Sequence, residues 1–364
     1  MREIASLELH LAIKELAERI EGGYLRKFYE DGRDSFRIIF YKHGASTAVY
    51  CRLVKTFNAT KYSVDAGPAT QFAIAMRKRV ENAKVSRIYQ YGTERVIIVE
   101  LAAGPEAYSI AIEMFGKGNL VLVKDGKIDL CYKRIIYKER EVRSKAVYPI
   151  AGGRMSIEET ENSAVELIET ACAEDDMLIR ALSRYINVGP VYLDDALRSQ
   201  GLDPKAKADS ADRGAVAHAI AYLFDRLAEP EPIIYMKDGT EIDYSAYPLE
   251  KYSGTEKISF GSMNELLDEF NKNGRLGHDE ESEKRAAEME ASVRKQRELA
   301  KRFAEEEIEY AEAGRKILEN MNAINALIAD ARQRRKPSID ELNGSSAIKV
   351  ISVDLKRKVL TIEL

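Results

Sequence analysis

The chain has 364 residues, of which 45% are hydrophobic and 32% charged, and this length is enough for two or three domains with a packed core. No segment approaches the ~18 consecutive apolar residues of a membrane span, and the amphipathic start MREIASLELHLAIKEL does not resemble a signal peptide, so we expect a cytoplasmic protein. The three cysteines and four histidines are scattered, without CxxC or HExxH, which argues against a metal site and favours free thiols in a reducing compartment.

The net charge of −4 is unevenly distributed along the chain. Residues 1–150 contain 26 basic and 18 acidic residues, a net charge of +8, whereas the remainder contains 30 basic and 42 acidic residues, a net charge of −12. A local excess of positive charge favours contact with a polyanion such as nucleic acid. Uneven charge is also common in proteins without such a partner.

Residues 1–150 are predicted to form one α+β domain with an antiparallel sheet. Apolar residues at helical spacing predict helices over 6–21 and 68–83, the first ended by Gly22-Gly23 and the second begun by Pro68. Alternating apolar residues between turn residues predict strands. The expected strands are 23–30, 34–42 and 46–54 between the helices, and 85–91, 94–101, 107–115, 119–124 and 127–132 after them.

Residues 151–230 are predicted to form short helices. Within them, INVGPVYLDDALRSQGL has the layout of a helix-hairpin-helix, in which Gly189 permits a tight turn and Pro190 starts the next helix. The free N–H groups at such a helix start can hold a phosphate. A plain helical connector with a Gly-Pro turn explains the same residues.

The rest of the chain is predicted to contain an arm. Residues 231–279 carry a hairpin around Asp238-Gly239 and a short helix over 261–270. A heptad pattern then predicts a coiled-coil helix over 280–336, followed by 337–364 as part of a further domain. The narrow seam of this helix needs a partner, which is either a second chain in a homodimer or a returning helix that is missing; we favour the missing helix.

No motif points to an active site. GKGN at 116–119 is best explained as a hairpin turn rather than a phosphate loop, and no nucleophile, base and acid can be grouped. Two basic segments are more informative, because Lys and Arg contact phosphates and tyrosines can stack on unpaired bases. A solvated face explains them equally well. The candidate nucleic-acid-binding residues are Arg77, Lys78, Arg79, Lys84, Lys133, Arg134, Lys138, Arg140 and Gly189, with Tyr132, Tyr137 and Tyr148 interleaved in or close to the second segment.

The order of these pieces resembles the NFACT family, which includes NEMF and RqcH proteins, over essentially the whole chain. The matching segments are SLELHLAIKEL, PATQFAIAMRKRVENAKVSRIYQYGTERVIIVEL, AYSIAIEMFGKGNLVLVKDGKI, INVGPVYLDDAL, YPLEKY and FGSMNELLDEFN. The resemblance implies an NFACT-N domain, a helix-hairpin-helix domain, and a coiled coil that carries a middle domain. It also implies a fold similar to the N-domain of formamidopyrimidine-type DNA glycosylases.

The resemblance further implies a function in rescue of stalled ribosomes. Family members bind a large ribosomal subunit that still carries peptidyl-tRNA, and they recruit tRNA, here expected to be alanyl-tRNA, for message-independent tailing of the nascent chain. The ribosome forms the peptide bonds, so the factor is expected to be no enzyme and to need no cofactor or metal. A DNA-binding relative of the glycosylases is the alternative, although the proline nucleophile of those enzymes is absent from the start Met1-Arg2-Glu3. An adhesion function is disfavoured.

The resemblance assigns tailing to three residues. An Asp-Arg pair of the family aligns with Glu94 and Arg95, and a further family Asp aligns with Glu8. Both acidic residues are one methylene longer here, so Arg95 is the most secure of the three. The alternative is an ion pair that anchors the first helix to the sheet. We expect Arg95 to face the same side of the sheet as Ile97 and Val99, where an Arg requires a carboxylate or a phosphate.

Overall fold

The structure is a computed structural model. The structure describes residues 2–62, 68–136, 141–148, 155–272, 280–334 and 336–364, with the backbone alone for 280–293. Lys138, Arg140 and Tyr137 lie outside the described residues. The chain divides into two compact units, Met1–Gly277 and His278–Leu364. Among the described residues, no helix combines the length and apolar character that crossing a bilayer requires.

The first unit is built on a nine-stranded antiparallel sheet in the order β4-β3-β2-β1-β5-β6-β7-β8-β9. Strands β1 and β5 share only one register pair, Tyr24 with Lys84, so the sheet opens there into halves of four and five strands. The side chains of Phe36 on β2 and Tyr132 after β9 meet with ring centroids 4.9 Å apart, so the two halves face each other. The strands are Tyr24–Gly32, Ser35–Lys42, Ala45–Arg52, Thr56–Thr60, Lys84–Gln90, Val96–Ala103, Glu106–Glu113, Asn119–Lys124 and Lys127–Cys131 for β1 to β9.

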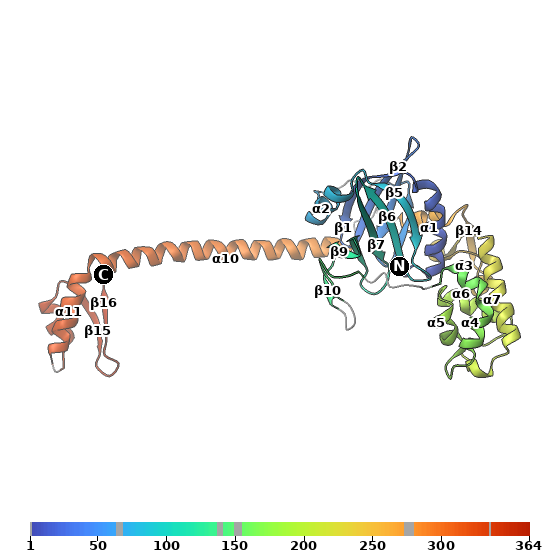
Figure 1. Ribbon diagram of the computed structural model, residues 1–364. Helices are drawn as coiled ribbons and strands as arrows, with labels where there is room; N and C mark the ends of the chain where they lie inside the picture. The colour runs from blue at the N-terminus through green and yellow to red at the C-terminus, as the bar shows by residue number, and fades with distance from the viewer. Residues whose placement is uncertain (1, 63–67, 137–140, 149–154, 273–279, 335) are drawn as a thin grey trace. The chain divides into compact units, whose positions relative to one another are not determined.

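Two helices pack against the nine-stranded sheet. Helix α1 (Ser6–Ile20) contacts β5, β4 and β2, and α2 (Gln71–Val80) contacts β1 and β6 (Figure 1). The mixed α+β class with a large antiparallel sheet is confirmed. Helix α2 starts later than expected, because the Thr70 side chain, rather than Pro68, caps it by accepting from the Ala73 N–H at 3.1 Å.

Two sequence expectations on strands need correction. Strand β4 was not predicted, since TFNAT lacks an alternating apolar pattern. Strand β6 begins at Val96, so Glu94 and Arg95 belong to the preceding turn. The GKGN segment is a hairpin turn between β7 and β8, as expected; a Cβ on Gly118 would lie 2.7 Å from that of Leu53, so the turn packs directly on the other half of the sheet.

A second apolar cluster covers the outer face of β6 to β9. It includes Val121, Val123 and Tyr148, whose hydroxyl donates to buried Glu113 at 3.0 Å. The small strands β10 (Ile135–Ile136) and β11 (Glu141–Val142) also belong to this face. Tyr148 is therefore a core residue.

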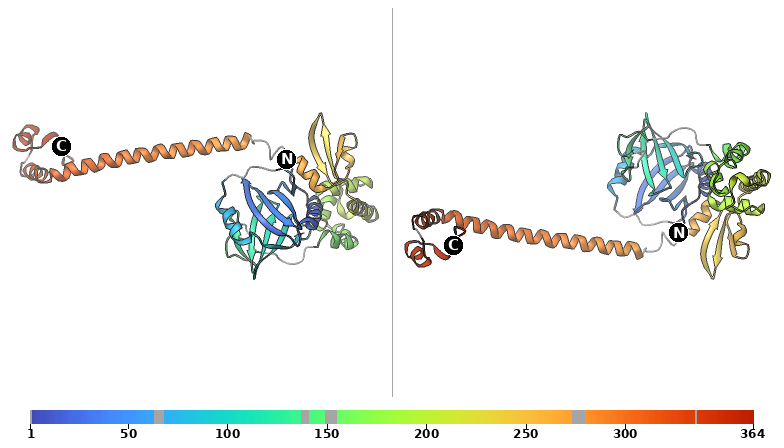
Figure 2. Two further views of the ribbon diagram at one scale, coloured as in Figure 1. Left: turned by 90° about the horizontal axis from the view of Figure 1, so that it is seen from above. Right: turned by 90° about the horizontal axis from the view of Figure 1, so that it is seen from below.

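Helices follow the sheet in the first unit and gather at one side of it (Figures 1 and 2). Their core is continuous with that of the sheet. A three-stranded sheet, in the order β13-β12-β14, and helix α8 complete the unit. The bounds are Ile157–Asn162, Ala164–Ala171, Leu178–Tyr185, Pro190–Ser199 and Arg213–Ala228 for α3 to α7, Ile233–Lys237, Thr240–Ser245 and Glu256–Ser259 for β12 to β14, and Met263–Phe270 for α8.

The second unit contains the long helix α10 (Glu280–Glu319), which is ~60 Å long at 1.5 Å per residue. The helix predicted over 280–336 is interrupted at Asn320, whose φ of −98° and ψ of 8° depart from helical values and whose side-chain amide donates to the Lys316 carbonyl at 2.9 Å. Helix α11 (Met321–Gln333) then packs on α12 (Ile339–Ser345) and on the hairpin β15 (Lys349–Asp354) and β16 (Val359–Glu363). The heptad residues Phe303 and Tyr310 on α10 are exposed.

Candidate functional site

A cavity of about 430 Å³ lies where the N-terminal segment, the loop before β6 and the α5–α6 hairpin meet. It is lined by three cations and two carboxylates, which come from four separate parts of the chain. Two of the lining residues, Arg95 and Gly189, were predicted from the sequence. The lining residues are Arg2, Glu3, Ile4, Ala5, Ser6, Arg95, Asn187, Gly189, Pro190, Val191, Asp243 and Lys251.

The loop that carries Arg95 is held by its buried neighbour Thr93. The Thr93 carbonyl accepts hydrogen bonds from the Ser6 hydroxyl at 2.6 Å and from the Asn187 side-chain amide at 3.0 Å. The Leu7 N–H donates to the Val188 carbonyl at 3.2 Å. These bonds join the start of α1, the loop and the hairpin into one rigid support for Arg95.

The Arg95 guanidinium contacts the N-terminal segment. Its Nη1 donates to Glu3 Oε2 at 2.6 Å and to the Ile4 carbonyl at 3.3 Å, so an ion pair links the loop before β6 to the segment that precedes α1. The Glu94 carbonyl accepts from the Gln90 side-chain amide at 2.9 Å. The Arg95 side chain is 27% exposed and its Glu3 partner 48% exposed, so Arg95 is accessible from the cavity.

Glu8 is fully buried, and its carboxylate accepts several hydrogen bonds. Its Oε2 accepts from the Ala5 N–H at 2.8 Å and from Arg2 Nη1 at 3.0 Å. Its Oε1 accepts from the Tyr192 hydroxyl at 2.7 Å and also pairs with Arg2 Nη2. Glu8 therefore does not face the cavity, and it holds together α1, the N-terminal segment and α6.

Arg2 extends this network to the three-stranded sheet. Its Nε donates to Asp243 Oδ1 at 2.7 Å, its Nη2 donates to the Tyr244 carbonyl at 2.8 Å, and the guanidinium lies 4.0 Å from the Tyr244 ring centroid. Burial alone lowers the pKa of Arg2, but the Glu8 carboxylate outweighs it and leaves the pKa above its ordinary value. Burial and the Glu8 charge raise the pKa of Tyr192 well above its ordinary value.

Gly189 places the start of α6 against the N-terminal segment. Its φ of +116° disfavours L-residues, and a Cβ there would lie 3.0 Å from the Ala5 Cβ. Pro190 is the first helical residue, as expected. The positive end of the α6 dipole therefore lies at the cavity edge beside Arg95.

The other predicted basic residues lie away from this cavity, and several are already paired. Arg77 Nε donates to the Phe28 carbonyl at 2.7 Å, Arg79 pairs with Asp129, and Lys133 Nζ lies 2.8 Å from Asp34 Oδ1. The structure records no hydrogen bond or ion pair between other described residues and the exposed side chains of Lys78, Lys84 and Arg134. These three are the candidates most available to a phosphate.

The two described tyrosines of the second basic segment do not offer stacking faces. Tyr148 is buried under the sheet, and Tyr132 packs edge-on against Phe36 and near Phe72. The Tyr132 hydroxyl accepts from the Asp34 N–H at 3.1 Å. Their packing disfavours the alternative in which these two rings stack on bases, because both rings pack against the apolar core.

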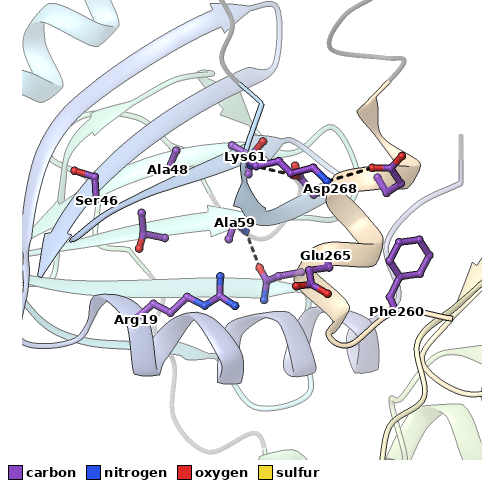
Figure 3. A pocket seen from close by; sticks show the side chains of 12 residues that line it. Arg19, Ser46, Ala48, Ala59, Lys61, Phe260, Glu265 and Asp268 are labelled. Carbon is purple, nitrogen blue, oxygen red and sulfur yellow. Dashed lines mark hydrogen bonds and ion pairs between the residues drawn. The ribbon is translucent and has the colours of Figure 1, made fainter.

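A second cavity, of about 360 Å³, lies between α1, β4 and α8 (Figure 3). Here α8 side chains satisfy the free edge of β4: Asn264 Oδ1 accepts from the Ala59 N–H at 2.7 Å, and Asp268 Oδ2 accepts from the Lys61 N–H at 3.0 Å. Glu15 in turn accepts from the first N–H groups of α8 at 2.7 and 3.0 Å. The FGSMNELLDEF segment thus docks the end of the first unit onto its beginning.

Sequence reasoning missed Arg2, Glu3, Asp243 and Lys251 in the first cavity. Arg2 and Asp243 are 241 positions apart, and no local pattern marks either of them. Among the described residues, no group of three or more His, Cys, Asp or Glu side chains is placed to hold a metal ion.

The nine-stranded sheet, the α5–α6 hairpin and the long helix α10 together define a class of protein. Residues 6–360 match the family described as NFACT N-terminal and middle domains, so the chain belongs to this family. Among its relatives is the archaeal Rqc2 homolog aRqcH of Methanocaldococcus jannaschii, 24% identical over 352 residues, which are 92% of this chain and 52% of that protein. The ribosome quality control complex subunit NEMF homolog of Drosophila melanogaster is 28% identical over 138 residues, 36% of this chain and 14% of that protein. The chain is thus a distant homologue of ribosome quality control factors, and it spans about half of the length of aRqcH and less of the NEMF homolog.

Solved structures show the same fold. The fibrinogen binding protein of Staphylococcus aureus superposes with a TM-score of 0.60 at 16% identity, covering 73% of this chain and 99% of that one. The N-terminal part of the fibronectin/fibrinogen-binding protein of Streptococcus suis superposes with a TM-score of 0.56 at 17% identity, covering 74% and 98%. At these identities the likeness concerns the fold alone.

Proposed function

We propose that the chain acts in the cytoplasm as part of a ribosome-associated quality-control factor. It binds large ribosomal subunits that carry stalled peptidyl-tRNA and recruits tRNA, alanyl-tRNA by family resemblance, for message-independent tailing of the nascent chain. The ribosome forms each peptide bond, and the factor supplies binding and positioning. Membership of the NFACT family and the similarity to aRqcH support this proposal.

The cavity around Arg95 is the observation that carries the proposal. Arg95, Lys251 and the positive end of α6 border one space of about 430 Å³. Guanidinium groups bind phosphate with paired hydrogen bonds, and helix N-termini favour anions. The Lys251 side chain is 43% exposed, and its ammonium forms a long ion pair with Asp243 at 3.8 Å, so a phosphate in the cavity would compete with Asp243 for it. A backbone phosphate of RNA fits this chemistry.

Replacing Arg95 with Ala is expected to abolish tailing without unfolding the protein. Its ion pair with Glu3 is partly exposed, and such pairs contribute ~1 kcal/mol or less to the free energy of unfolding. Tail synthesis is measured on purified large subunits that carry peptidyl-tRNA, and stability is measured by chemical denaturation. Arg95→Lys is the matched variant, since it keeps the charge and loses the paired donors. Normal tailing by Arg95→Ala would show that the ion pair is only structural.

A broader experiment tests the class of function directly. RNA that co-purifies with the intact factor is sequenced, and enrichment of one tRNA together with large-subunit RNA is expected. The glycosylase alternative predicts instead that the protein cleaves abasic or oxidised duplex DNA. No contact in the described site favours that alternative, since Arg2 is held by Glu8 and Asp243 and a guanidinium is no nucleophile.

A further inference from the structure

Two tyrosines are exposed side by side on the outer face of the sheet, away from the cavity. Tyr24 on β1 and Tyr41 on β2 are direct cross-strand partners, and they are 43% and 36% exposed. The next β1 residue inward, Leu25, and also Phe28 are fully buried. The strand alternation therefore turns Tyr24 and Tyr41 outward, where packing of the core does not account for two large rings.

Cations surround these rings. The Arg26 guanidinium carbon lies 5.7 Å from the Tyr24 centroid and 5.4 Å from the Tyr41 centroid, and Lys84 is the register partner of Tyr24 across the β1–β5 junction. Lys27 and Arg87 are exposed on the same two strands. We call Tyr24, Arg26, Lys27, Tyr41, Lys84 and Arg87 the Tyr24 face. Acidic residues lie beside this face as well: Glu100 is opposite Arg87 and accepts from the Tyr89 hydroxyl at 3.2 Å, and Glu21 accepts from the Ile88 N–H at 2.8 Å.

We propose that the Tyr24 face binds unpaired RNA, with bases stacked on Tyr24 and Tyr41 and phosphates paired with Arg26, Lys84 and Arg87. Aromatic rings on an open sheet bind single-stranded bases by stacking, and cations beside them follow the backbone. The four cations of the Tyr24 face favour a polyanion over a protein surface. Arg26 lies near both rings in the free protein, and its Nη1 donates to Asn82 Oδ1 at 2.6 Å. These contacts are exposed, so the guanidinium can turn to a phosphate when bases replace it.

This face is separate from the Arg95 cavity. Helix α1 starts at Ser6, which lines the cavity, and ends at Ile20, just before Tyr24. Fifteen helical residues span ~22 Å, so the two sites lie at opposite ends of α1. One folded RNA with an unpaired loop is long enough to reach both, but binding at the Tyr24 face does not require the cavity.

The test uses the full chain and an unstructured oligoribonucleotide of about ten nucleotides, with the same sequence in a duplex as a second probe. Fluorescence anisotropy is expected to show tighter binding of the single strand than of the duplex. Tyr24→Ala and Tyr41→Ala are each expected to weaken single-strand binding by about 5- to 150-fold. Tyr24→Phe keeps the ring and is expected to bind nearly as tightly as the wild type.

Matched controls separate stacking from general effects. Tyr310 on α10 is 73% exposed, and Tyr310→Ala is expected to bind as the wild type does. Arg95→Ala is also expected to keep single-strand binding, so loss of tailing with intact oligonucleotide binding separates the two sites. The proposal is overturned if the wild type binds no single strand, if it prefers the duplex, or if both tyrosine variants bind unchanged.

Discussion

Glu8, Arg2 and Asp243 form a line of alternating charge through the base of the cavity. Glu8 is fully buried, while the side chains of Arg2 and Asp243 are 29% and 15% exposed. Each charge has partners of opposite sign or hydrogen-bond donors, which is the condition for keeping charges away from water. The family resemblance assigns tailing to the Glu8 position, and the contacts suggest that Glu8 acts there by positioning Arg2 and the start of α1.

Replacing Glu8 with Ala is expected to lower the free energy of unfolding by about 3 kcal/mol, because the buried Tyr192 hydroxyl loses its acceptor and keeps only the bond from the Ala246 N–H, and Arg2 keeps Asp243 as its remaining carboxylate. The measurement is urea denaturation followed by circular dichroism. Glu3→Ala is the matched control, since its ion pair is half-exposed and the expected loss is within ~1 kcal/mol. Equal losses for the two variants would contradict the role of Glu8 as the buried anchor.

Stability is expected to decrease in acid partly through Asp243. Burial acts to raise the pKa of this carboxyl, but Arg2, the Tyr244 N–H and the Tyr252 hydroxyl outweigh it and leave the pKa below its ordinary value. A lowered pKa in the folded state stabilises the protein above the unfolded pKa of about 3.9, and this contribution is lost as the pH falls through the folded pKa. Denaturation between about pH 5 and 2 should show a smaller fall for Asp243→Asn than for the wild type, and an equal fall would exclude Asp243 as a contributor.

At the scale of elements, helix α8 covers the open edge of strand β4 in the nine-stranded sheet. An edge strand presents unpaired N–H and C=O groups that invite association with other chains. Two side chains of α8 pair with the Ala59 and Lys61 N–H groups of this edge, and Asn264 Nδ2 also donates to the Ala12 carbonyl at 2.9 Å. A short helix that follows the helical region in sequence is thus part of the sheet layer in space.

Asn264→Ala and Asp268→Ala are each expected to expose the β4 edge. Hydrogen exchange at the Ala59 and Lys61 amides should become faster, and the free energy of unfolding should fall by about 1–3 kcal/mol, because a buried partner is removed from each bond. Glu265→Ala is the matched control, since Glu265 lines the same cavity but is exposed. Unchanged exchange at Ala59 in Asn264→Ala would mean that α8 is not what protects the edge.

At the scale of the whole molecule, binding of RNA depends on charges that are free to meet phosphates. The chain as a whole carries −4, and the excess of positive charge belongs to residues 1–150. Within α2, Arg77 is bound to a backbone carbonyl and Arg79 to Asp129, whereas Lys78 is exposed. A phosphate contact is therefore better tested at Lys78 than at Arg77 or Arg79.

Lys78→Gln is expected to weaken tRNA binding and to reduce the slope of log K against log salt by about 1, as the loss of one phosphate contact requires. Binding is measured by filter retention at several salt concentrations. Lys301→Gln on α10 is the control, since Lys301 is 80% exposed in the second unit. A slope identical to that of the wild type would remove α2 from the RNA-binding surface.

Local patterns predicted much of the fold. The apolar run in VIIVELAA and the pattern in EAYSIAIE predicted strands; these strands pack one face in the main core and the other under the second cluster. Helical spacing predicted α1, which packs one face in the main core. Strand β14 was missed because all of its residues are exposed, and β4 because its polar Thr56 and Asn58 are buried by later segments. The break of the arm at Asn320 is a local change of backbone angles, which a heptad count does not register.

The sequence by itself was sufficient for the class of fold and the family, and the predicted residues Arg95 and Gly189 both line the first cavity, while their function stays a prediction. Only the tertiary structure decided that Arg95 pairs with Glu3, that Glu8 is buried beneath the cavity, and that Tyr148 is core. The reason is physical: apolar periodicity is set by neighbours three or four positions away, whereas partners of a buried charge are chosen by the packing of distant segments. Arg2 in the N-terminal segment and Asp243 on β13 are 241 positions apart, and they meet because the three-stranded sheet packs against the N-terminal segment.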